Sequence, residues 1–123
     1  MPSSDFTLER HSYEGVTLLL AGGDIDMTAS REFGRRLEAA LRAAPGDVLL
    51  DLDGVIYLDS TALRALLHAR KLAEEGSAGL ALVCSNRSVL HVLDVTGLTE
   101  IFDVHGDRAA ALAAIGAADR PNR

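Results

Sequence analysis

The chain has 123 residues, of which 48% are hydrophobic and 24% are charged, and its formal net charge is −6. This length and composition predict one soluble domain over residues 1–123, with a core at about residues 6–116 and frayed ends. The acidic balance, without any run of Lys or Arg longer than two, argues against nucleic acid and acidic membranes as partners.

Cysteine usage and hydropathy indicate the compartment. One cysteine, Cys84, excludes an intrachain disulfide and favours a reducing environment. Residues 1–15 lack the apolar run of a signal peptide, and no apolar run approaches the ~20 residues of a membrane span. We therefore expect a cytoplasmic protein.

Segments with strand periodicity alternate with longer segments of helical periodicity. In chain order, the sequence predicts strands at 6–11 and 15–21, a helix at 30–44, a strand at 47–52, a helix at 60–75, a strand at 79–84, a helix at 86–95, a strand at 101–104 and a final helix capped by Asp107. The alternation predicts an α/β fold with a mixed, mainly parallel sheet of four to five strands, covered by about four helices.

Glycines mark the expected ends of several elements. Asp53-Gly54 predicts a turn between the strand at 47–52 and the short apolar stretch VIYL. Gly76 and Gly97 are expected to end the helices that precede them.

The predicted helix at 60–75 has a buried side and an exposed side. Residues at sheet-packing spacing are small or apolar: Ala62, Ala65, Leu66, Ala69, Leu72 and Ala73. Leu63 and Leu67 follow Ser60 at i+3 and i+7, with Arg64 beside them. We expect an exposed strip, part apolar and part basic, beginning at Ser60. The alternative is that both leucines contact a neighbouring helix.

Asp59-Ser60-Thr61 stands where a buried strand becomes a helix, and this edge of an α/β sheet commonly binds ligands. Three roles compete for the serine: helix cap, catalytic nucleophile or phosphorylation site. Capping accounts for one of Asp59 and Ser60, not for both. Helix amides would favour a phosphate there, while Asp59, Asp24 and Asp26 would crowd it with negative charge.

The sequence gives little support for catalysis or for a cofactor. A serine nucleophile needs a neighbouring base, and no histidine lies in a catalytic signature: His11, His68, His91 and His105. The G-x-S-x-G, dinucleotide-binding, P-loop and metal-ligand spacings are absent. Three carboxylates could indicate a metal site or a phospho-acceptor aspartate, but at strand ends and turns we expect them to be solvated: Asp51, Asp53 and Asp59.

Three segments in order resemble the STAS domain, specifically the stand-alone bacterial anti-sigma factor antagonists. AGGDID before MTAS resembles the family's G-[ED]-[LI]-D loop leading into the first helix. VLLDLDGVIYLDSTAL resembles its strand, D-S-[ST] turn and second helix start, and VLHVLDVTGLTEIFDV resembles its S/T-G-L-containing ending. The resemblance extends over about residues 6–116.

The resemblance implies a protein that binds a serine-kinase anti-sigma factor and thereby releases a sigma factor. It implies phosphorylation of Ser60 by that kinase, removal of the phosphate by a phosphatase, and a monomer or weak homodimer. The expected partner-binding residues are Asp24, Asp26, Asp59, Ser60, Thr61, Leu63, Arg64 and Leu67. Ala62 and Arg64 replace glycines that are common in the family, which bears on the docking distance.

Two other functions remain open. The chain could be a STAS subunit of a larger assembly, such as a lipid-transport ATPase complex or a stressosome-type scaffold, with the helix from Ser60 as a constant interface. It could also be an enzyme or ligand carrier, which would require a deep pocket beside Ser60 and His105.

Overall fold

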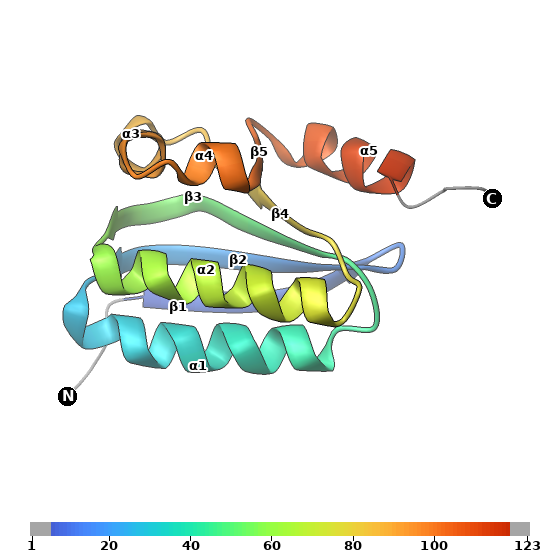
Figure 1. Ribbon diagram of the computed structural model, residues 1–123, viewed down its shortest axis with the longest axis horizontal. Coiled ribbons are helices and arrows are strands. Elements are labelled where there is room, and N and C mark those ends of the chain that lie inside the picture. Colours follow the sequence, from blue (N-terminus) through green and yellow to red (C-terminus); the bar gives the residue numbers. More distant parts are fainter. Residues whose placement is uncertain (1–5, 119–123) are drawn as a thin grey trace.

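The computed structural model describes residues 6–118, which form an α/β sandwich around a five-stranded sheet (Figure 1). The elements are β1 (Phe6–Tyr13), β2 (Val16–Ile25), α1 (Met27–Ala43), β3 (Val48–Leu58), α2 (Ser60–Glu75), β4 (Leu80–Val83), α3 (Arg87–Val95), α4 (Leu98–Ile101), β5 (Asp103–His105) and α5 (Arg108–Ala118). The strand order is β1-β2-β3-β4-β5, with β1 antiparallel to β2 and the other pairs parallel. The predicted mixed, mainly parallel sheet is confirmed.

Alternating strand residues contribute to two hydrophobic clusters, one on each face of the sheet. Leu50 and Leu82 belong to the larger cluster, which also holds most of the buried apolar residues of α1 and α2. Their chain neighbours Leu49 and Val83 belong to a second cluster with Ala111 of α5. In Figure 1, α1 and α2 run along the sheet in the same direction and start at the same end of the molecule. In residues 6–118, no helix combines the length and apolar character needed to cross a bilayer.

The prediction of a turn at Asp53-Gly54 is wrong, because β3 continues through both residues to Leu58. The pairing of β2 with β3 shifts register twice, between Leu20 and Gly22 and again between Gly23 and Asp24. Gly54 lies against the backbone of β2: a Cβ there would stand 3.0 Å from the carbonyl oxygen of Ala21. Gly54 therefore allows the two strands to approach closely at a bulge, and it does not form a turn.

Other element boundaries also differ from the prediction. Helix α1 begins at Met27, three residues before the expected start, because Asp26 caps it. The last strand was expected from Ile101, but Ile101 ends the short helix α4 and β5 begins at Asp103. Gly97 stands at φ 80° just after α3, which confirms it as the expected stop.

Asp51 is a structural carboxylate, so the expectation that it is solvated is wrong. Its side chain is 6% exposed and accepts a hydrogen bond of 2.6 Å from Nε of Arg108 at the start of α5. The other carboxylate oxygen accepts from the backbone N–H of Asp53. A buried charge requires such partners, and this pair attaches α5 to the sheet.

The close approach at Gly54 predicts a specific sensitivity to side-chain size. Gly54→Ala places a methyl group 3.0 Å from one backbone atom of β2 and 3.3 Å from another. We expect a loss of about 1–3 kcal/mol in the free energy of unfolding, measured by urea denaturation. Gly106→Ala is the matched control, since its Cβ would meet nothing within 4 Å. Equal stability of the two variants would contradict the role given to Gly54.

Candidate functional site

Two helices begin side by side at the carboxyl edge of the sheet. Ile25 and Leu58 are register partners at the ends of the parallel strands β2 and β3. The backbone N–H of Asp59 donates to the carbonyl of Ile25 at 3.2 Å, which joins the two strand ends. The residue that follows each strand is the N-cap of the next helix. Asp26 follows β2 and caps α1, and Asp59 follows β3 and caps α2.

Asp26 is held by the first turn of α1. Its Oδ1 accepts hydrogen bonds from the Thr28 hydroxyl at 2.7 Å and from the backbone N–H groups of Thr28 and Ala29, each at 3.1 Å. The Thr28 hydroxyl bond, followed by the Ala29 amide bond, lowers the pKa of Asp26 below its ordinary value. A fixed, exposed negative charge therefore stands at this edge.

Asp59 caps α2 in the same way and also engages Thr61. Its Oδ1 accepts from the backbone N–H of Ala62 at 3.0 Å and from the Thr61 hydroxyl at 2.6 Å. The Thr61 oxygen in turn lies 2.7 Å from the hydroxyl oxygen of Ser30 in α1. Thr61 is half-buried and Ser30 is buried, so this hydroxyl pair joins the first turns of the two helices.

Ser60, by contrast, is exposed at the first position of α2. Within residues 6–118, its hydroxyl makes no hydrogen bond. Amides at a helix N-terminus and the helix dipole favour an anion on such a residue. The serine thus combines access from outside with a local environment that tolerates a phosphate.

The exposed strip of α2 differs from the predicted one. Leu63 is 8% exposed and belongs to the main core, so the expectation that it is exposed is wrong. It lies one turn before buried Leu66 and shares that side of the helix. Leu67, at 39% exposure, and Arg64 do lie on the open side, at spacings from Ser60 that keep all three on one face.

Sequence reasoning missed three exposed apolar side chains at the same edge: Met27 at 73%, Ile56 at 68% and Tyr57 at 51% exposure. Met27 directly follows Asp26, and Tyr57 is the register partner of half-buried Asp24. In a regular strand, successive side chains point to opposite faces of the sheet, so only one of Ile56 and Tyr57 would be exposed. The second register shift, between Gly23 and Asp24, changes that alternation, and the Gly22-Gly23 pair was its available signal in the sequence.

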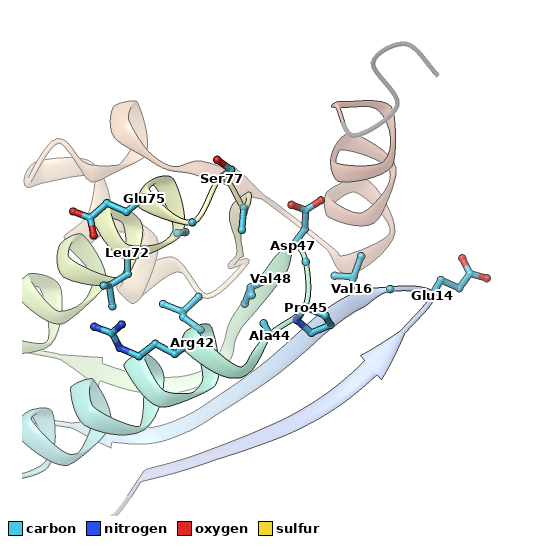
Figure 2. Close-up of a pocket in the computed structure, with 16 residues that line it drawn as sticks. Glu14, Val16, Arg42, Ala44, Pro45, Asp47, Val48, Leu72, Glu75 and Ser77 are labelled. Atoms are coloured by element: carbon cyan, nitrogen blue, oxygen red, sulfur yellow. The ribbon is translucent and has the colours of Figure 1, made fainter.

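A hollow of about 710 Å³ lies at the other end of the molecule, between the β1–β2 turn and the carboxyl ends of α1 and α2 (Figure 2). Figure 2 shows Glu14 and Glu75 on opposite sides of it, pointing away from each other. Neither Ser60 nor His105 lines it, so it is not the pocket that an enzyme or carrier using those residues would need. In the part of the chain from 6 to 118, no three His, Cys, Asp or Glu side chains gather to hold a metal ion.

A family model described as STAS domain matches residues 7–111, and the chain therefore belongs to the STAS domain family. The chain is similar to a protein named anti-sigma F factor antagonist from Paenibacillus polymyxa, with 24% identity over 106 residues, covering 85% of this chain and 91% of that protein. The predicted family is confirmed.

Solved structures agree with this assignment. The crystal structure of an anti-sigma factor antagonist from Mycobacterium paratuberculosis has a TM-score of 0.82 at 25% identity, over 94% of this chain and 98% of that one. The Bacillus cell fate determinant SpoIIAA in its phosphorylated form shares the fold, with a TM-score of 0.64 at 15% identity over 89% of this chain and 98% of that one.

The hydrogen bonds of Asp26 predict a measurable change in its titration. Thr28→Val removes the hydroxyl that contributes most to the lowered pKa, so the pKa of Asp26 should rise toward its ordinary value. In the unaltered chain, ionised Asp26 stabilises the fold above its unfolded-state pKa, and this stabilisation is lost as pH falls through the lower folded value. Carboxyl-carbon NMR titration measures the shift.

Thr99→Val is the control for that titration, because its hydroxyl donates to Asp94 instead. The pKa of Asp26 should be unchanged in this variant. An identical titration of Asp26 in both variants would show that the Thr28 hydroxyl does not hold the carboxylate.

Proposed function

We propose that this chain is an anti-sigma factor antagonist: a binding module, not an enzyme, that docks on a serine-kinase anti-sigma factor and so releases a sigma factor. The observation that carries the proposal is the hydroxyl of Ser60, which is exposed at the capped start of α2, beside the capped start of α1, and makes no hydrogen bond within residues 6–118. The names of the relatives support the class of partner. The exchange would take place in the bacterial cytoplasm, as the sequence predicts.

Ser60, rather than its neighbour Thr61, is the proposed phosphate acceptor. The hydroxyl of Thr61 donates to Asp59 and contacts Ser30, and its side chain is half-buried between two helices. A kinase would have to break these bonds to reach that oxygen. The Ser60 oxygen is free of such bonds within the described chain and can enter a kinase active site without local unfolding.

The switch is a change of charge at a docking surface. Phosphorylation adds about −1.5 to −2 charge at neutral pH. The first backbone N–H groups of α2 stabilise that charge, so the domain remains folded. Asp59, Asp26 and Asp24 already make the surface acidic, and a partner complementary to the free hydroxyl would meet added bulk and repulsion. A phosphatase that removes the group would restore docking.

The proposed docking surface is wider than the predicted one. It comprises exposed or half-buried side chains at the carboxyl edge of the sheet and on the open side of α2: Asp24, Asp26, Met27, Tyr57, Asp59, Ser60, Thr61, Arg64 and Leu67. Apolar anchors surrounded by polar groups are the usual composition of a protein interface. Leu63 is excluded because it is buried.

A constant interface within a larger STAS assembly is the second candidate. The exposures of Met27, Ile56 and Tyr57 favour it, because large apolar side chains are commonly covered in permanent complexes. Recovery of a stable assembly carrying an unmodified Ser60 would support this function over the switch.

Charge at Ser60 should control affinity for the kinase. With the serine-kinase anti-sigma factor of the same organism, Ser60→Ala should bind within about twofold of the unaltered chain. Ser60→Asp should bind about tenfold or more weakly, because a carboxylate repels the partner where the hydroxyl did not. Isothermal titration calorimetry measures both dissociation constants.

Ser88→Asp provides a matched control for this experiment. Ser88 is an exposed serine in the first turn of another helix, α3, which is capped by Asn86. The variant carries the same added charge in the first turn of a capped helix, one position further from the cap than Ser60, and its affinity for the kinase should not change. Undiminished binding by Ser60→Asp would argue against the switch.

A further inference from the structure

A chain of side-chain hydrogen bonds crosses between the two helices beneath Ser60. Thr61 Oγ1 lies 2.6 Å from Asp59 Oδ1 and 2.7 Å from Ser30 Oγ. Ser30 is only 6% exposed, and it also lies 3.2 Å from the carbonyl oxygen of Met27. A buried hydroxyl destabilises the fold unless it makes hydrogen bonds.

The direction of this chain follows from its acceptors. Each hydroxyl carries one proton, and the carboxylate oxygen of Asp59 accepts. Thr61 therefore donates to Asp59, and its oxygen accepts the proton of Ser30. The shorter distance to Thr61 than to the Met27 carbonyl agrees with this direction.

Neither Ser30 nor Thr61 is needed to cap a helix. Asp59 alone accepts the Ala62 amide, and Asp26 accepts the amides of Thr28 and Ala29. What the hydroxyl pair adds is a link between α1 and α2. On one side of the link lie Asp26 and exposed Met27, and on the other lies Ser60.

We infer that Ser30 and Thr61 are positioning residues, whose mutual hydrogen bond holds the start of α1 and the start of α2 in the relative placement that a kinase partner recognises. The inference rests on the proposed function, because it concerns docking at Ser60. A partner that meets a fixed surface does not have to order it on binding. Because the Ser60 hydroxyl takes no part in the link, losing the link weakens recognition without altering the reacting oxygen.

Phosphorylation kinetics with the serine-kinase anti-sigma factor at saturating ATP test this inference on the full chain. Thr61→Val and Ser30→Ala should each raise KM about two- to tenfold, the range expected for one hydrogen bond, and leave kcat within about twofold. Thr61→Ser keeps the hydroxyl and should restore the KM of the unaltered chain. Because Thr61→Val already removes the bond that Ser30→Ala removes, the double variant should have the KM of Thr61→Val alone.

Thr96→Val is the control, since its hydroxyl donates to carbonyls within α3, at Val92 and Leu93. Its KM should be unchanged. Unaltered KM in both Thr61→Val and Ser30→Ala would overturn the inference, as would fully additive effects or a Thr61→Ser variant as impaired as Thr61→Val. Absence of phosphorylation in the unaltered chain would instead count against the proposed function.

A readout without any partner separates these two failures. In Thr61→Val, amide hydrogen exchange of Ala29 and Ser30, across the link in α1, should quicken about two- to tenfold. Amides of the central strand, such as Leu50, should exchange as before. Unchanged exchange at Ala29 and Ser30 would show that the bond does not hold α1, whatever the kinase does.

Discussion

Parallel pairing of β2 with β3 is the constraint on which the site depends. Because both strands run in the same direction and end in register at Ile25 and Leu58, the chain leaves both at one edge of the sheet. In each case the next residue is an aspartate that caps the following helix. Two helix starts with two fixed carboxylates thus lie together, although 33 positions separate Asp26 from Asp59 in the sequence.

The polar groups at this edge differ in how many hydrogen bonds they make within the fold. Asp26, Asp59 and Thr61 are occupied by hydrogen bonds within the fold. Two of the four histidines lie beside other carboxylates: His68 is 3.5 Å from Glu38, and His105 is 3.5 Å from Asp103. Within residues 6–118, the exposed Ser60 hydroxyl has no hydrogen-bonded base of the kind that activates a serine.

The sequence predicted what local patterns determine. Helix α2 begins and ends at the expected residues, and the sheet has the expected mixed pairing, because alternation of strand and helix periodicity defines an α/β fold. The order of three family-like segments predicted the STAS family. The exposure of Ser60 followed from its place at the start of a helix that packs on a sheet.

What the sequence did not predict depends on contacts between distant segments. Gly54 suggested a turn, and only its approach to Ala21 reveals a bulge within a continuous strand. The same bulged pairing exposes Ile56 and Tyr57 together. Leu63 is spaced by three residues both from exposed Ser60 and from buried Leu66, so spacing alone does not decide its burial and the surrounding core does. The Ser30–Thr61 bond joins side chains 31 positions apart, and no local pattern indicates it.

Phosphate mapping decides most directly whether this edge is a switch. The full chain is incubated with a serine-kinase anti-sigma factor of its own organism and ATP, and the modified residues are identified by mass spectrometry. A single phosphate on Ser60, with Thr61 and Ser88 unmodified, is the expected result. Phosphate on Thr61 or Ser88, or a chain that binds the kinase and stays unmodified, would contradict the assignment of Ser60 as the switched residue.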